Sequence, residues 1–226
     1  MGVFYKFNLG CDIMYNTVFF DLDGTLTDPG EGITNSVAFA LKKFNISVED
    51  KTELYKFIGP PLVDSFMKYY GFSKRDALLA VDYYREYFAD KGIFENKVYD
   101  NIPKLLSKIK NSGRKIALAT SKPENFAKQI LVYFGLDGYF DFIGGATMDE
   151  SRSKKADVIN YVINELNIKD LSGVVMVGDR LHDIYGAKQN AINSIGVLFG
   201  YGDRNELETA GATHIAETVD DIYRFL

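Results

Sequence analysis

The sequence predicts an α/β protein in which a doubly wound parallel sheet carries an inserted, all-helical second domain. From residue 96 onward, short apolar runs alternate with amphipathic helical patterns, an order typical of parallel strands joined by right-handed crossovers. A further apolar run, Thr17-Val18-Phe19-Phe20, precedes this part. The stretch between them has helical periodicity alone. We therefore expect a sheet-based core from residues 1–27 and 96–226, and a helical domain from residues 28–95.

Composition and charge narrow the class of protein. The 226 residues are 46% hydrophobic and 25% charged, with a net charge of -5, so a basic surface for nucleic acid or anionic membranes is not expected. No run approaches the ~18 apolar residues of a membrane span. The single cysteine, Cys11, cannot form a disulfide within the chain, which favours a cytoplasmic protein. Residues 1–13 do not resemble a signal peptide, and we expect a peripheral extension ahead of Met14.

The predicted helical domain contains three helices. We expect them at residues 32–45, 62–70 and 74–90, where apolar residues recur at helical spacing. The rigid turn Gly59-Pro60-Pro61 precedes the second helix, and Gly71 ends it. The third helix is expected to bury an apolar stripe of Leu78, Val81, Tyr84 and Phe88.

Strands and helices alternate after residue 96. The expected helices are 102–111, 124–134 and 156–166. The expected strands are 115–119, 141–143, 174–177 and 194–198, each a short apolar run of the kind found in buried parallel sheets.

Two carboxylates follow the first strand. Asp21 and Asp23 lie on the same side of an extended chain, at the strand end where open α/β sheets hold ligands. Such close acids repel each other unless a cation, a proton or a phosphate relieves them. Gly24 permits a sharp turn at this point. The alternative is an ordinary turn with solvated acids.

Three later sites fall where a strand ends or a helix begins. Thr120 follows a strand, and its hydroxyl could hold a phosphoryl oxygen, although a helix N-cap is the alternative. Lys154 and Lys155 oppose the dipole of the helix that they begin, which points to a compensating anion or, alternatively, to solvated charges. Asp179 and Asp183 are four residues apart and suit Mg²⁺; His182 suits it less well, and we expect a spectator.

These sites resemble, in chain order, the four motifs of haloacid dehalogenase superfamily phosphatases. The motifs are Asp21-Leu22-Asp23-Gly24-Thr25, then Thr120, then a lysine at position 154 or 155, and last Gly178-Asp179 with Asp183. The resemblance spans Tyr15 to Leu226. The insertion, with Phe57-Ile58-Gly59-Pro60-Pro61-Leu62, is similar to the cap domain of phosphoglycolate phosphatases and related 5'-nucleotidase-like members. The resemblance to this superfamily implies a Rossmann-like core and a helical cap. It also implies a Mg²⁺-dependent phosphatase that hydrolyses a small phosphorylated metabolite, as a monomer or a homodimer.

The resemblance also implies roles for individual residues. Asp21 would be the nucleophile and would form an aspartyl phosphate, while Asp23 would be the general acid and base. Thr120 and Lys155 would act with them, with Lys154 as the alternative because the usual prolines around this lysine are absent. The implied substrate-binding residues are Gly24, Thr25, Ser121, Pro60, Pro61 and Leu62. The implied ligands of Mg²⁺ are Asp21, the carbonyl of Asp23, Asp179 and Asp183.

Other activities stay open on the sequence. A 5'-nucleotidase or a pyrophosphatase of the same family fits the motifs equally well. A β-phosphoglucomutase-like phosphotransferase shares the cap position but resembles Asp-x-Asp-Gly-Val in its first motif, so that Thr25 favours a phosphatase. A catalytically silent binding protein is expected to lack one of the ionisable groups, and every one of them is present here.

Overall fold

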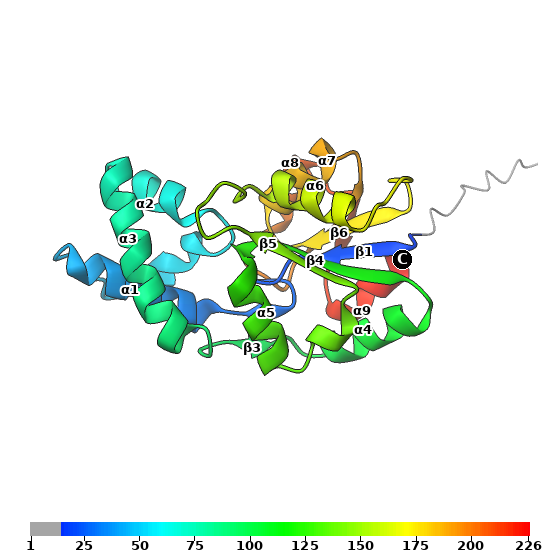
Figure 1. The fold of residues 1–226 in the computed structure, drawn as a ribbon, viewed down its shortest axis with the longest axis horizontal. Coiled ribbons are helices and arrows are strands. Elements are labelled where there is room, and N and C mark those ends of the chain that lie inside the picture. Colours follow the sequence, from blue (N-terminus) through cyan, green and yellow to red (C-terminus); the bar gives the residue numbers. More distant parts are fainter. Residues whose placement is uncertain (1–14) are drawn as a thin grey trace, which may run out of the picture.

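The computed structural model describes residues 15–226. The expectations for residues 1–13, Cys11 and Met14 lie outside this range. A parallel sheet with helices on both faces forms one part of the molecule, and helices α1, α2 and α3 stand together at one end of it (Figure 1).

The strands are β1 (Thr17–Phe20), β2 (Thr27–Asp28), β3 (Lys97–Val98), β4 (Lys115–Pro123), β5 (Phe142–Ala146), β6 (Val174–Gly178), β7 (Asn193–Val197) and β8 (His214–Ala216). The α-helices are α1 (Gly30–Lys43), α2 (Leu62–Tyr70), α3 (Lys74–Tyr87), α4 (Ile102–Asn111), α5 (Glu124–Tyr133), α6 (Lys155–Glu165), α7 (Leu181–Gln189), α8 (Arg204–Ala210) and α9 (Val219–Ile222). Shorter helical turns are η1 (Lys51–Phe57), η2 (Phe88–Gly92), η3 (Asp137–Tyr139) and η4 (Tyr223–Phe225).

The main sheet has the order β5-β4-β1-β6-β7-β8, and all its neighbouring strands are parallel. Alternate residues of β1 face opposite sides, as a strand requires. Val18 and Phe20 belong to the core that includes residues of α4, α5 and α9, whereas Phe19 packs with residues of α6 and α7. The predicted α/β class and doubly wound parallel sheet are therefore confirmed.

The helical segment leaves the core after β2 and returns to it at β3. These two short strands pair antiparallel with each other, so that the segment's two connections lie side by side. Gly32 donates its backbone N–H to the carbonyl of Glu95 at 2.9 Å, and a Cβ on Gly32 would collide with the carbonyl of Gly92. These glycines thus permit close packing. The domain boundaries at residues 28 and 95 stay predictions.

Several elements differ from the expectation. In α3 the buried face consists of Ala77, Ala80, Val81 and Tyr84, while Leu78 is 44% exposed. The expected apolar stripe was therefore wrong at Leu78, because that residue lies on the outer side of the helix. β4 continues to Pro123, where it pairs with β5 after a register shift. Within residues 15–226, no helix combines the length and apolar character needed to cross a membrane.

Candidate active site

Three neighbouring strands bring the predicted polar residues to one edge of the sheet. Asp21 follows β1, and Asp179 follows β6, which pairs with β1. Thr120 lies within β4, on the other side of β1. Because β4 extends past it, Thr120 is not the N-cap of α5; that position belongs to Pro123. The site therefore occupies the carboxyl ends of the central strands, where open α/β sheets hold ligands.

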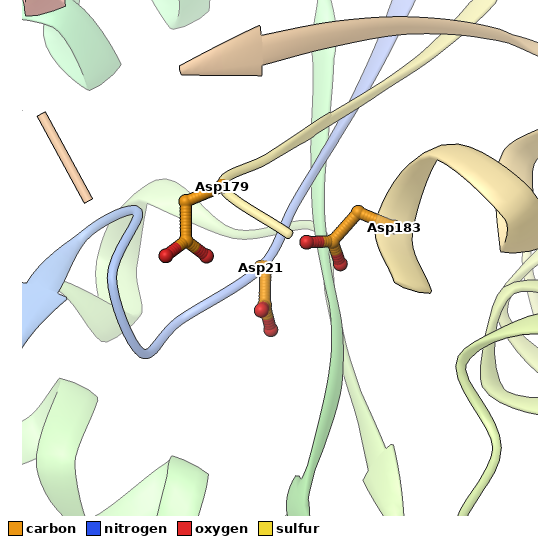
Figure 2. A group of neighbouring side chains, drawn as sticks. All are labelled: Asp21, Asp179 and Asp183. Carbon is orange, nitrogen blue, oxygen red and sulfur yellow. The ribbon is translucent and has the colours of Figure 1, made fainter. Parts of the chain in front are cut away.

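Three aspartates form a buried acidic cluster. Asp21, Asp179 and Asp183 each direct one carboxylate oxygen to within 4.8 Å of the others, and all three are at most 4% exposed (Figure 2). Asp179 Oδ1 has no hydrogen-bond partner among the described residues. Burial raises the pKa of Asp179 well above its usual value, and the charges of Asp183 and Asp21 raise it further.

This donor set fits Mg²⁺. Carboxylate oxygens are the hard ligands that the ion prefers, and a cation among them would relieve the repulsion that raises the pKa of Asp179. Asp179 Oδ1, which lacks a hydrogen-bond partner in the described part of the chain, is available as a ligand atom. The side chain of Asp23 lies outside the group of three, consistent with its expected use of the backbone carbonyl instead.

Lys155 lies against the cluster. Its Nζ is 2.7 Å from Asp21 Oδ1 and 2.8 Å from Asp183 Oδ1, and it donates to the carbonyl of Ala119 at 3.0 Å. Burial disfavours the ammonium, but the charges of Asp183 and Asp21 outweigh burial and raise the pKa of Lys155. Lys154 is exposed at the N-cap of α6. Of the two lysines, therefore, only Lys155 contacts the acidic cluster; its catalytic role stays a prediction.

The partner of Asp23 is a residue that the sequence reasoning missed. Lys122 Nζ lies 2.6 Å from Asp23 Oδ2 and 4.5 Å from the ring centroid of Phe88. Burial raises the pKa of Asp23 even though the charge of Lys122 opposes the shift. Residues two apart in a strand face the same side, but this signal does not reach Lys122 in the sequence, because the predicted strand ends at residue 119 whereas β4 continues to Pro123.

The turn after Asp23 packs directly on the acidic cluster. Gly24 has φ +82°, a left-handed value that favours glycine, and a Cβ there would overlap the carboxylate of Asp179. Thr25 is fully buried, and its hydroxyl has no hydrogen-bond partner within residues 15–226. Neither residue is among those that line the cavity beside Asp21, so their expected contact with substrate stays a prediction.

A cavity opens in front of Asp21 and Asp23. The core contributes Thr120, Ser121, Lys122, Glu150 and Ser153 to its wall. The helical segment contributes mainly apolar residues, among them Pro60 and Pro61 of the loop before α2 and Leu62, the first residue of that helix. Its one charged residue in this wall is Arg85, paired with Glu150 at 2.6 Å. The expected catalytic aspartates and the expected Pro-Pro-Leu loop thus face one cavity.

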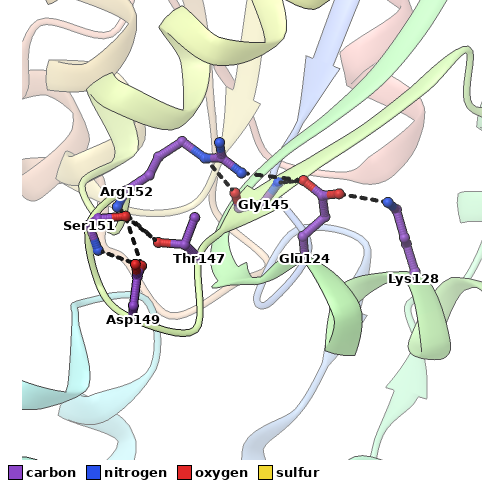
Figure 3. A network of polar contacts seen from close by, with 7 residues as sticks. All are labelled: Glu124, Lys128, Gly145, Thr147, Asp149, Ser151 and Arg152. Atoms are coloured by element: carbon purple, nitrogen blue, oxygen red, sulfur yellow. Dashed lines mark hydrogen bonds and ion pairs between the residues drawn. The ribbon is translucent and has the colours of Figure 1, made fainter.

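A polar network fixes the loop that leads from β5 to α6. Arg152 donates from Nε to the carbonyl of Gly145 at 3.0 Å and lies 3.5 Å from Glu124 (Figure 3). Asp149 accepts hydrogen bonds from the backbone and hydroxyl of Ser151. The same loop holds Glu150 at the cavity wall and continues into the helix that begins with the buried lysine.

The comparison with protein families shows the family to which the chain belongs. A model of the family described as "Haloacid dehalogenase-like hydrolase" matches residues 18–197. The chain belongs to this family. The matched range includes every strand end that carries a polar residue of the site, and the resemblance inferred from the motifs is confirmed.

Relatives within the family are named as phosphate-handling enzymes. The chain is 43% identical to the 5'-nucleotidase of Pseudomonas aeruginosa, over 89% of this chain and 91% of that protein. It is 35% identical to the tyrosine-protein kinase PtkA of Mycobacterium tuberculosis, over 91% of this chain and 70% of that protein. The crystal structure of a predicted phosphatase from Clostridium acetobutylicum is 53% identical, with a TM-score of 0.91, and the match covers 93% of this chain and 97% of that one. Phosphoglycolate phosphatases and a pyrophosphatase are also among the relatives, at 27% to 29% identity. The chain is accordingly a haloacid dehalogenase-like hydrolase.

Proposed function

We propose that this hydrolase is a Mg²⁺-dependent phosphatase that cleaves a small-molecule phosphate monoester through an aspartyl phosphate on Asp21. The observation that carries the proposal is the double position of Asp21. It lines the cavity beside Asp23 and also belongs to the buried cluster with Asp179 and Asp183. Mg²⁺ bound by this cluster and by the Asp23 carbonyl would offset the negative charge of the phosphoryl group.

Asp21 and Asp23 divide the reaction between them. In the first step an oxygen of Asp21 forms a bond to phosphorus while the bond from phosphorus to the leaving-group oxygen breaks. Asp23, in its protonated form, gives that oxygen its proton. Burial of Asp23 favours this form, because it raises the pKa of the carboxyl. In the second step Asp23 takes a proton from the water that attacks phosphorus, which frees Asp21 and inorganic phosphate.

Neighbouring groups hold the nucleophile and the phosphoryl oxygens. Lys155 contacts Asp21 directly and carries a positive charge that offsets developing negative charge. Thr120 and Ser121 line the cavity, and their hydroxyls are the donors that we expect at the phosphoryl group. These contacts recognise phosphate alone, so the leaving group must be selected elsewhere.

We assign selection of the leaving group to the helical segment, residues 28–95, acting as a cap. Pro60, Pro61 and Leu62 reach the cavity that holds the two aspartates, which supports this assignment. A nucleoside monophosphate is the first candidate substrate, because the 43% identical relative is named 5'-nucleotidase. Phosphoglycolate, pyrophosphate and sugar phosphates are the alternatives.

Initial rates over a panel of these esters, with Mg²⁺ present, test the proposal. We expect hydrolysis of p-nitrophenyl phosphate and of at least one natural ester, and loss of both in Asp21→Asn. Asp220→Asn, which changes an exposed aspartate of α9, is the matched control and should retain full activity. Retained activity in Asp21→Asn would contradict the nucleophile assignment. Transfer of phosphate between positions of a hexose phosphate, without release of inorganic phosphate, would favour the mutase instead.

A further inference from the structure

Arg180 connects the strand end that carries Asp179 to the loop that lines the cavity. Its guanidinium donates from Nη1 to the carbonyl of Ile58 at 2.7 Å and from Nε to Glu206 at 2.9 Å. The side chain is only 15% exposed. A charged donor with two mostly buried acceptors has little freedom to reorient, so Arg180 constrains the position of the Ile58 carbonyl.

The contact partner of Arg180 begins the loop that faces the substrate cavity. Ile58 precedes Gly59 and Pro60, both of which line that cavity together with Asp21. Gly59 has φ +100°, and a Cβ there would lie 2.9 Å from Cγ of Arg180. The loop backbone therefore packs against the arginine side chain in addition to its hydrogen bond, and glycine is the residue that permits the close approach.

A second contact attaches the same part of the cap to Asp179. Tyr201 donates its backbone N–H to Asp179 Oδ2 at 2.8 Å. Its ring meets Tyr55 of η1 edge-on, with ring centroids 5.5 Å apart. Two residues next to Asp179 thus contact this part of the cap. Arg180, which follows Asp179 in the chain, contacts the loop after η1, and Tyr201, which is hydrogen-bonded to Asp179, contacts η1.

We propose that Arg180 is a positioning residue that fixes residues 58–62 over the cavity and thereby sets the affinity for the leaving group. This inference rests on the proposed phosphatase function. Arg180 is not a catalytic residue, since it acts on substrate only through the loop. Replacing its side chain leaves the backbone hydrogen bond from Arg180 N to Asp183 in place. The forked guanidinium is the required feature, because it alone reaches Ile58 and Glu206 together.

The test compares Arg180→Met and Arg180→Lys with Arg204→Met. Arg204 is a matched control, because it is 47% exposed and pairs with Glu208 and Glu217 on the surface. For the best ester of the panel, we expect KM to rise about tenfold in Arg180→Met with kcat little changed, the factor given by loss of one charged hydrogen bond. Hydrogen exchange of peptides covering residues 55–66 should also accelerate by about tenfold, with or without substrate turnover.

Arg180→Lys tests whether the forked shape of the guanidinium matters, because it changes that shape and keeps the positive charge. It keeps a cation near Asp179 but lacks the planar fork that places Nη1 and Nε on separate acceptors, so we expect it to resemble Arg180→Met. Full recovery of KM and exchange in Arg180→Lys would overturn the inference, as would Arg180→Met behaving like Arg204→Met. If Arg180→Met does not fold, Glu206→Gln, which weakens the same fork, is expected to accelerate exchange in the same peptides. A wild-type protein that hydrolyses none of the esters would refute the proposed function, and the exchange measurement would still test the loop contact.

Discussion

Lys155→Met is expected to destabilise the protein strongly in the absence of metal. The substitution keeps most of the side-chain volume and removes an ammonium that lies within 2.8 Å of both Asp21 and Asp183. Breaking a buried ion pair costs about 3–5 kcal/mol, because the remaining charge stays buried without compensation. Two carboxylates lose their partner here, so we expect a loss in the upper part of that range. At about 2–4 °C per kcal/mol for a chain of this size, the melting temperature should fall by roughly 8–20 °C.

The loss of folding stability in Lys155→Met should depend on pH and on Mg²⁺. Burial raises the pKa of Asp183 to about 6 even with Lys155 present, and removal of the ammonium raises it further. A carboxyl with a raised pKa in the folded state binds its proton more tightly there than in the unfolded chain, so its contribution to stability is lost as the pH rises through that pKa. The variant should therefore lose more stability at about pH 8 than at about pH 5. Mg²⁺, as a substitute cation, should restore part of the loss at the higher pH.

Urea denaturation with and without Mg²⁺ measures these changes, and Lys154→Met is the matched control. Lys154 is exposed one residue away, and its substitution should change the free energy of unfolding by no more than about 0.5 kcal/mol. Equal stability of the two variants in metal-free buffer would refute the reasoning, because it would mean that the ion pairs of Lys155 are not formed in solution.

Three further predictions concern the reaction. Asp23→Asn should slow an alkyl phosphate more than p-nitrophenyl phosphate, because the poorer leaving group needs the proton; equal slowing would argue against the acid role. Excess chelator should abolish hydrolysis and Mg²⁺ should restore it, with Asp179→Ala raising the required Mg²⁺ concentration more steeply than Asp183→Ala; full activity in chelator would exclude the metal. Pro61→Ala and Leu62→Ala should reorder kcat/KM across the ester panel while barely changing that for p-nitrophenyl phosphate; a uniform loss would assign the loop to folding or chemistry.

The strand ends of the site could be predicted because each combines an apolar run with a polar residue. Asp21 and Asp179 follow such runs directly, and the structure brings them into one cluster. Thr120 lies toward the same carboxyl edge of the sheet, but within β4 and not after it, because the strand continues to Pro123. The strands β2, β3 and β8 were missed, because two or three residues are too few to show an alternating pattern.

Contacts between side chains distant in sequence were beyond the reach of pattern reasoning. Neighbouring lysines at a helix start look alike in periodicity. The family resemblance implies Lys155, and its burial and its ion pairs with Asp21 and Asp183 distinguish it from Lys154 in the structure. Lys122 falls between the predicted strand 115–119 and the predicted helix 124–134, so the sequence does not report its pairing with Asp23. The hydrogen bond from Arg180 to Ile58 joins residues 122 positions apart, and no local periodicity reports such a contact.

The antiparallel pairing of β2 with β3 affects whether the helical segment could be excised or replaced by another segment. Because the chain leaves and re-enters the core at adjacent points, a short link from Asp28 to Lys97 would close the core path without reordering the six-stranded sheet, as in tolerated domain insertions. The apolar packing has no such boundary. Phe88 of η2 meets Phe126 of α5 edge-on, with ring centroids 5.4 Å apart. Excision of the helical segment would therefore expose Phe126 to solvent. A transplanted replacement segment would need an apolar group at that point.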